Sequence, residues 1–137
     1  MSLMNIFDLS GTALTAQSTR LDAISANMAN SQVVASTPEE AYRARLPVFA
    51  TLFGDSFNQA EIAGVEVRDI VESKVPVEER YEPDHPMANE QGFVYEANVN
   101  MVEEMANMIS ASKSYTSNVE VMRTSKQLLQ RTLSIGS

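Results

Sequence analysis

The only histidine in the sequence, His85, is the residue whose type and surroundings most suggest chemistry. It lies between Asp84 and Pro86, with Glu82 nearby, and so offers a candidate metal ligand or hydrolytic base. A structural zinc site needs about four ligands, usually with cysteine among them, and the sequence has no cysteine. The proline-bounded loop therefore favours a residue that makes local hydrogen bonds over a metal ligand or a catalytic group.

Two pairs of neighbouring carboxylates, Glu39-Glu40 and Glu78-Glu79, are the other candidates for acid–base work. Paired carboxylates catalyse such reactions in a cleft that separates their pKa values, and nothing in the surrounding sequence indicates a cleft. The sequence contains no glycine-rich phosphate loop, no GxSxG and no HExxH. We therefore predict a protein that is not an enzyme, with no catalytic residue, no cofactor and no metal.

The C-terminal segment carries a methionine-rich stripe. One seven-residue series consists of Met101, Met108, Tyr115, Met122 and Leu129, and a companion series of Met105, Ser112, Val119, Lys126 and Leu133. Five successive heptads predict a long helix of the coiled-coil type. Asn100 is its predicted N-cap, with Glu103 and Glu104 in the first turn. Methionine surfaces adapt to varied partners, so the stripe is either an interface between chains or ordinary core packing.

The N-terminal segment predicts a second long helix, over residues 1–30. Its apolar side chains recur every seven residues at Phe7, Leu14, Leu21 and Met28, with Leu3 and Ile24 on the adjoining line. Only Asp8, Arg20 and Asp22 are ionised, whereas a helix that faces water usually has a charged outer face. Small residues around such a helix allow close packing on several sides. We expect the terminal helices to pair with each other and with further copies; a buried helix of an ordinary globular domain is the alternative.

Residues 31–98 differ from both ends in charge and in periodicity. They carry −8, equal to the net charge of the whole 137-residue chain, while residues 1–30 carry −1 and residues 99–137 carry +1. Alternation over residues 42–48 and 65–71, and the run 93–95, predict three strands separated by prolines and loops. The predicted fold is therefore α+β. Long terminal helices (1–30 and 99–137) pair as a coiled coil, and a small antiparallel β-rich region (31–98) is inserted between them.

Charge and hydropathy argue against binding to nucleic acid, insertion into a membrane and export with a cleaved signal peptide. Binding to nucleic acid needs clustered Lys and Arg, and the net charge is −8. No apolar run approaches the length of a membrane helix, so we expect no membrane insertion. The first basic residue is Arg20, and the start of the chain does not have the pattern of a cleaved signal peptide. Export would therefore use a route that reads no cleaved signal.

Several short motifs give the sequence a resemblance to a known family. Residues 13–16 (Ala-Leu-Thr-Ala) and 21–31, with Asn27-Met28-Ala29-Asn30, resemble the opening signature of the flagellar rod and hook proteins. Residues 81–88 (Tyr-Glu-Pro-Asp-His-Pro-Met-Ala), 92–94 (Gly-Phe-Val) and 110–115 (Ser-Ala-Ser-Lys-Ser-Tyr) are similar to the proximal rod members. Met28, Ala97 and Lys113 depart from the residues usual there, which are Leu, Pro and Arg.

The resemblance implies a structural subunit of the basal-body rod, a hollow drive shaft in the periplasm that links the MS ring to the distal rod and hook. It implies export by the flagellar type III secretion apparatus and helical polymerisation through the terminal helices. The implied partners are further copies of the chain, the rod proteins FlgB, FlgF and FlgG, and the MS-ring adaptor FliE. A soluble helical adaptor or secretion chaperone is the alternative from another class.

The residues predicted to form the assembly interface lie on both terminal helices. They are Phe7, Leu14, Leu21, Ile24, Asn27, Met28, Asn30, Met101, Met105, Met108, Tyr115, Val119, Met122 and Leu129.

Overall fold

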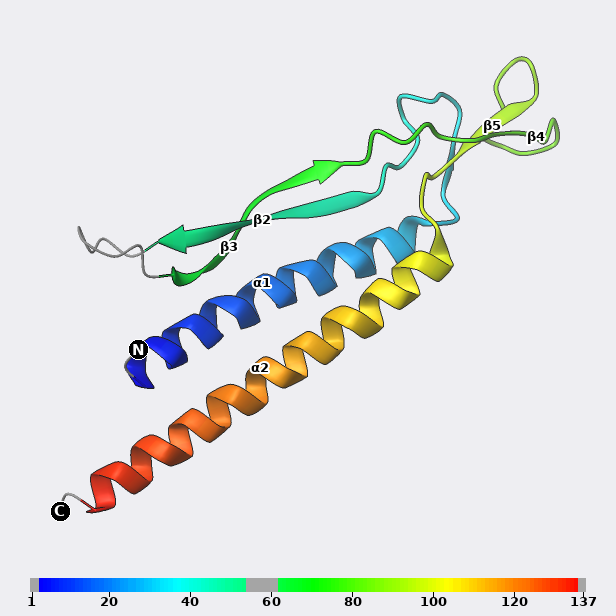
Figure 1. Ribbon diagram of the computed structural model, residues 1–137. Helices are drawn as coiled ribbons and strands as arrows, with labels where there is room; N and C mark the ends of the chain where they lie inside the picture. Colours follow the sequence, from blue (N-terminus) through cyan, green and yellow to red (C-terminus); the bar gives the residue numbers. More distant parts are fainter. Residues whose placement is uncertain (1–2, 54–61, 136–137) are drawn as a thin grey trace. The chain divides into compact units, whose positions relative to one another are not determined.

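The computed structural model describes residues 3–53 and 62–135, in which the chain begins and ends with a long helix and forms short strands between them in the sequence (Figure 1). The helices are α1 (Leu3–Asn30) and α2 (Met101–Ile135). The strands are β1 (Val34–Ala35), β2 (Arg45–Phe53), β3 (Ile62–Glu72), β4 (Glu79–Tyr81) and β5 (Phe93–Glu96). The predicted α+β class, with a helix at each end and a small β-rich middle, is confirmed.

The chain divides into two compact units, each built from segments that are far apart in the sequence. The first contains residues 1–21, 47–69 and 110–137, with six acidic and six basic side chains, and we call it the neutral unit. The second contains residues 22–46 and 70–109, with twelve acidic and four basic side chains, and we call it the acidic unit. The acidic unit therefore carries the whole net charge of −8.

In the neutral unit, the first part of α1 packs closely against β3. Gly64 is buried, and a Cβ atom at this position would lie only 2.6 Å from Thr12 Oγ1. The Thr12 hydroxyl donates a hydrogen bond to Leu9 O (2.9 Å) and accepts one from the Val65 N–H (3.2 Å). Gly64 thus permits a close approach of strand to helix that a side chain would prevent. Among the described strands, β2 and β3 form a sheet of two strands, so each is an edge strand. An edge strand such as β2 tolerates a proline, here Pro47.

The neutral unit also contains the larger part of α2. A Cβ atom at Gly11 of α1 would lie 3.8 Å from Met122 Cε of α2, which places the two helices in contact there. Ala111 and Ser125 of α2 are buried, as is Ala16 of α1. Small side chains at these positions allow the helices to approach closely.

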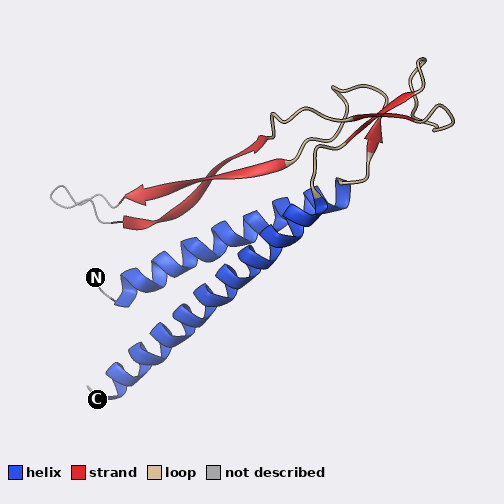
Figure 2. Cartoon of the chain, turned by 45° about the vertical axis from the view of Figure 1, so that its right-hand side comes forward, coloured by secondary structure: helices blue, strands red, loops and turns tan. Residues whose placement is uncertain are grey.

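In the acidic unit, β1, β5 and β4 form a three-stranded antiparallel sheet in that order. Figure 2 shows the strands of the chain in red and the loops that join them in tan. Val34 lies opposite Glu96, and Arg80 lies opposite Val94. Val94, on the central strand, is fully buried, so it anchors the sheet. The predicted strand at residues 93–95 is confirmed as β5, while β1 and β4 were not predicted because each has only two or three residues.

The ends of the helices are fixed by short-range hydrogen bonds. At the end of α1, Asn30 Nδ2 donates to Ala26 O (2.8 Å) and the Ser31 hydroxyl donates to Met28 O (2.8 Å). Met28 O is one of the carbonyl groups that the last turn of a helix leaves without a helical partner, and the Ser31 hydroxyl satisfies it. The signature residues Asn30 and Ser31 therefore end α1 where the sequence predicted.

The start of α2 is capped as predicted. Asn100 Oδ1 accepts hydrogen bonds from the backbone N–H groups of Val102 (3.0 Å) and Glu103 (3.2 Å). This is the usual arrangement of an asparagine N-cap. Glu103 and Glu104 then place negative charge at the positive end of the helix dipole.

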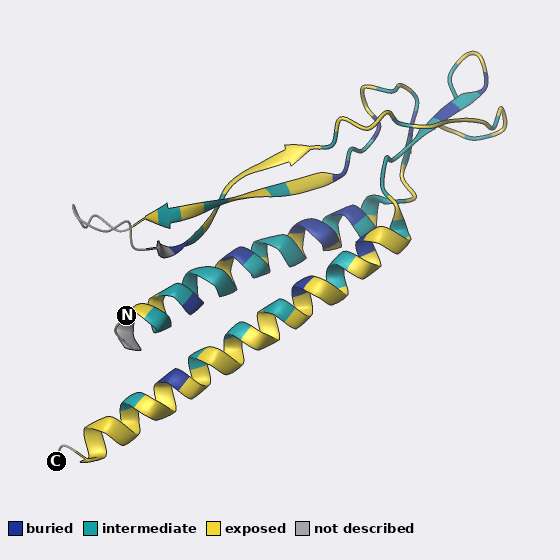
Figure 3. Cartoon of the chain, in the orientation of Figure 1, coloured by how far each residue is buried: buried dark blue, intermediate teal, exposed yellow. Residues whose placement is uncertain are grey.

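The two helices differ in how much of their surface the rest of the chain covers (Figure 3). Most residues of α1 are buried or half-buried, and those of α2 are mostly exposed. Within the neutral unit, α1 contacts both β3 and α2. Because two elements cover it, α1 has few charged residues.

Candidate assembly interface

Asn27, a residue of the α1 signature, is hydrogen-bonded inside the acidic unit and is only 1% exposed. Its Nδ2 donates to Arg45 O (3.0 Å), and its Oδ1 accepts from the Arg45 N–H (2.8 Å). The side chain therefore pairs with the first residue of β2 as a neighbouring strand would. Oδ1 also accepts a hydrogen bond from the Tyr42 hydroxyl (3.0 Å).

A second asparagine, Asn98, holds the same segment from the other side of the sequence. Its Oδ1 accepts from the Ala44 N–H (2.7 Å), and its Nδ2 donates to Val75 O (2.7 Å). Its backbone N–H donates to Tyr42 O (3.3 Å), and the Ser73 N–H donates to Ala44 O (2.8 Å). We call Asn27 and Asn98 together the asparagine clamp. The strand predicted over residues 42–48 begins only at Arg45, directly after the Ala44 N–H that Asn98 binds.

Tyr42 lies at the centre of this network, and its pKa is raised above the ordinary value for tyrosine. Burial is the largest cause, the positive charge of Arg45 opposes it, and the carboxylates of Glu104 and Glu72 add to it. The Arg45 guanidinium also lies 5.9 Å from the centre of the Tyr42 ring. Glu104 is itself buried, so the first turn of α2 contributes a carboxylate to the interior of the acidic unit.

Two residues of the predicted assembly interface, Ile24 and Asn27, are buried within the chain. Their contacts in the free subunit are therefore internal. Asn98 and Tyr42 were not singled out by sequence reasoning, although they make the same network. The sequence did contain a signal for this network in the two asparagines at 98 and 100. Asn98 binds the chain before β2, and Asn100 caps α2.

The methionine-rich stripe of α2 is only partly covered. Met101, Met108, Met122 and Leu129 are half-buried, and Tyr115 is exposed. The residues between them that turn inward are not the predicted companion series but the series one position earlier, at Glu104, Ala111, Asn118 and Ser125. The inward face of α2 is therefore completed by small and polar side chains, with Ala111 fully buried.

The predicted companion series consequently faces outward. Met105, Val119 and Leu133 are exposed, and so are several further apolar residues of α2: Val102, Ile109, Val121, Leu128 and Ile135. On α1, Phe7, Leu14, Leu21, Met28 and Asn30 are all half-buried. The larger unpartnered apolar surface thus belongs to α2.

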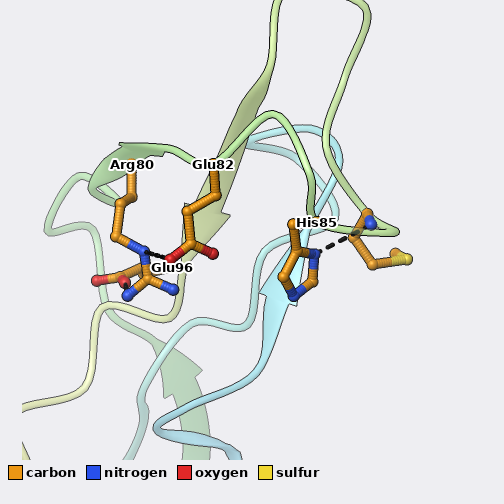
Figure 4. A network of polar contacts seen from close by, with 5 residues as sticks. Arg80, Glu82, His85 and Glu96 are labelled. Carbon is orange, nitrogen blue, oxygen red and sulfur yellow. Dashed lines mark hydrogen bonds and ion pairs between the residues drawn. The ribbon is translucent and has the colours of Figure 1, made fainter.

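His85 makes the local hydrogen bonds that the sequence favoured (Figure 4). Its Nδ1 accepts from the Met87 N–H (3.0 Å), and its backbone N–H donates to Glu82 O (3.1 Å). The ion pairs of Arg80 with Glu82 (3.0 Å) and with Glu96 lie apart from the imidazole. His85 therefore shapes the turn that precedes β5.

No metal-binding cluster accompanies this loop in the part of the chain that the structure describes. A cavity of about 410 Å³ is lined by Ser31, Gln32, Arg80 and Glu96, and the last two neutralise each other. Within residues 3–53 and 62–135, no group of three or more His, Cys, Asp or Glu could hold a metal ion. Over the same residues, neither helix is long and apolar enough to cross a membrane.

Known proteins match this chain in both helical regions and over nearly its whole length. Residues 7–34 match the family described as "Flagella basal body rod protein", and residues 90–135 match "Flagellar basal body rod FlgEFG protein C-terminal". The flagellar basal-body rod protein FlgC of Escherichia coli O6:H1 is 43% identical over 99% of both chains. This chain belongs to the FlgC family. FlgC of Salmonella typhimurium (41% identical) and of Buchnera aphidicola from Acyrthosiphon pisum (38%) match it over the same share of each chain.

Membership of the FlgC family confirms the predicted resemblance. The relatives are named as rod proteins, so the chain is a structural subunit of the flagellar basal-body rod and the adaptor alternative has no support. The two matched regions contain the signature of α1 and the whole of α2. Residues 35–89, which include β2, β3 and the His85 loop, are matched by the full-length FlgC relatives.

Proposed function

We propose that this rod subunit polymerises helically through its terminal helices, paired as a coiled coil, to form part of a hollow drive shaft between the MS ring and the distal rod and hook. Its neighbours would be further copies, FlgB, FlgF and FlgG, with FliE at the base. It would reach the periplasm through the flagellar type III export apparatus without a cleaved signal.

The observation that carries this proposal is the exposed apolar surface of α2. Val102 is 76% exposed, Ile109 71% and Ile135 86%, and each would gain by removal from water. Many large apolar side chains exposed on one helix indicate a contact with another molecule. A helix that must pack among many relatives needs such surface on several sides, and α2 has it along its whole length.

The charge distribution supports the same proposal. The neutral unit has equal numbers of acidic and basic side chains, so copies of it can pack side by side without strong repulsion. Residues 31–98, at −8, would be repelled by their own kind at close range and suit a place in water. We infer that the terminal helices form the packed wall of the rod and that residues 31–98 form its outer part.

Substitution of Val119, a predicted interface residue that is exposed on α2, tests the proposal. We expect Val119→Asp to block rod completion and motility, because it places a charge in the packed wall. The free subunit should lose no more than about 0.5 kcal/mol of stability, as is usual for exposed positions. Met108→Asp should also block motility, but Met108 is half-buried, so folding and assembly would both change.

Ser117→Asp provides the matched control, because Ser117 is exposed on the same part of α2 but lies off the predicted stripe. Motility in soft agar and electron microscopy of isolated basal bodies measure the outcome. Normal swimming by Val119→Asp, at normal subunit levels, would refute the assignment of this face to the assembly interface.

A further inference from the structure

The loop between β4 and β5, residues 82–92, is closed by side-chain acceptors of two chemical kinds. In its first half, His85 Nδ1 accepts a hydrogen bond from the Met87 N–H (3.0 Å). In its second half, Asn89 Oδ1 accepts one from the Gln91 N–H (3.0 Å). An amide oxygen accepts at every ordinary pH, whereas an imidazole nitrogen accepts only while it carries no hydrogen. The first half of the loop is therefore sensitive to protons, and the second half is not.

The bond to Met87 determines where the imidazole can take up a proton. Because Nδ1 accepts, the hydrogen of the neutral ring is on Nε2, and the remaining lone pair of the ring points at the Met87 N–H (Figure 4). A proton taken up by His85 therefore binds at Nδ1. Two N–H groups would then face each other across 3.0 Å, and the hydrogen bond would be lost.

Met87 also links the loop to the segment that follows β1. The Ser36 hydroxyl donates a hydrogen bond to Met87 O (2.9 Å), although the two residues are 51 positions apart in the sequence. The backbone of Met87 is thus held on both sides, by His85 at its N–H and by Ser36 at its carbonyl. Contacts grouped so closely along the chain tend to open together. Loss of the bond to His85 should therefore weaken the bond to Ser36.

We propose that the first half of the β4–β5 loop is a pH-sensitive clip, which is closed while His85 is neutral and releases the loop from Ser36 when a proton binds at Nδ1. The inference does not depend on the proposed helical assembly. Histidine is the side chain that ordinarily changes charge between about pH 5 and pH 8. His85 is the only histidine in the sequence, so a change in this loop over that range can be assigned to it.

The charged groups on the segments that flank or bind the loop leave this role to His85. They are Glu79 and Arg80 on β4, Glu96 on β5, Glu82, Asp84 and Glu90 on the loop, and Glu39 and Glu40 after Ser36. Arg80 forms ion pairs with Glu82 and Glu96, and these lie apart from the imidazole (Figure 4). The others are carboxylates, which ordinarily keep their charge from about pH 5 to pH 8.

NMR of the full-length chain tests the clip at the atoms that form it. At about pH 8, the nitrogen shifts of the ring should show Nδ1 without a hydrogen, and the Met87 amide should titrate together with the ring as the pH falls to about 5. Loss of one hydrogen bond should lower the protection factor of the Met87 amide against exchange by about fivefold. The Gln91 amide, which Asn89 binds, should keep its protection and serves as the internal control.

His85→Asn is the matched variant, because Asn89 shows that an asparagine in this loop accepts from the N–H two residues further on. It should keep the clip closed and abolish the pH dependence. His85→Ala has no acceptor, so its Met87 amide at about pH 8 should be as weakly protected as that of the unmodified chain at about pH 5. In the unmodified chain, the resonances of Ser36 should follow the titration of the ring.

Each of three results would overturn the proposal. The first is a ring hydrogen on Nδ1 at about pH 8, and the second is a Met87 amide whose protection does not follow the titration of His85. The third is a pH dependence that persists in His85→Asn. Resonances of Ser36 that stay fixed throughout would show that the loop is not released, and they would refute the clip as well.

Discussion

Replacement of Asn27 by alanine should destabilise the acidic unit more than any other single loss of an amide side chain. Asn27 is 1% exposed and takes part in three hydrogen bonds, two with the backbone of Arg45 and one with the Tyr42 hydroxyl. A typical hydrogen bond contributes about 1 kcal/mol, and a buried partner left unpaired costs about 1–3 kcal/mol. Arg45 is exposed, so water can replace part of the loss. We therefore expect Asn27→Ala to lower the free energy of unfolding by about 3 kcal/mol.

Asn30→Ala is the matched control, because it removes the same amide group three residues later on the same helix. Asn30 donates one described hydrogen bond, to Ala26 O within α1, and its loss should cost about 1 kcal/mol. Urea unfolding of both variants gives the comparison. Hydrogen exchange locates it, because the Arg45 amide should lose protection in Asn27→Ala and keep it in Asn30→Ala. Equal costs for the two variants would refute the internal role assigned to Asn27.

Two further predictions concern the neutral unit and the clamp. Gly64→Ala should lower the free energy of unfolding by about 1–3 kcal/mol, because the new Cβ atom would lie 2.6 Å from Thr12 Oγ1. In a Thr12→Ala background the same change should cost less, and urea unfolding of the double-mutant cycle measures the difference. The pKa of Tyr42 is raised in the folded chain, so the stability that its protonated hydroxyl provides is present below about pH 10 and is lost as the pH rises through the folded pKa. Tyr42→Phe should remove that alkaline loss, which urea midpoints measured against pH would reveal; an unchanged pH profile would contradict the assignment.

The sequence predicted the helices well because each has strong local signals. Seven-residue periodicity, the Asn100 cap and the Asn30-Ser31 end all act within a few residues. The strands were predicted less well. β5 follows a turn glycine and contains Phe93, Val94 and Tyr95, so its type was evident, whereas β4 is a short run of exposed residues that only its partner defines.

The site was harder to predict than the fold because burial depends on contacts that are distant in sequence. Asn27 was correctly singled out, but its partner Arg45 lies eighteen residues away, and no periodicity reveals the hydrogen bonds between them. The inward face of α2 within one chain could not be predicted for the same reason. An apolar pattern selects Met105 and Val119, while the packing selects the smaller Ala111 and Ser125, which let the helices approach.

The weak charge of α1 and the exposed apolar groups of α2 therefore have different explanations. The sequence suggested that both helices need neighbouring subunits, but α1 already contacts β3 through Thr12 and α2 through Gly11 in the same chain. A helix covered on two sides has little surface left for charged residues, so its composition no longer requires a polymer. The surface of α2 has no such internal explanation. It follows that substitutions on α1 should act mainly through the stability of the subunit, and substitutions on the outer face of α2 mainly through its assembly.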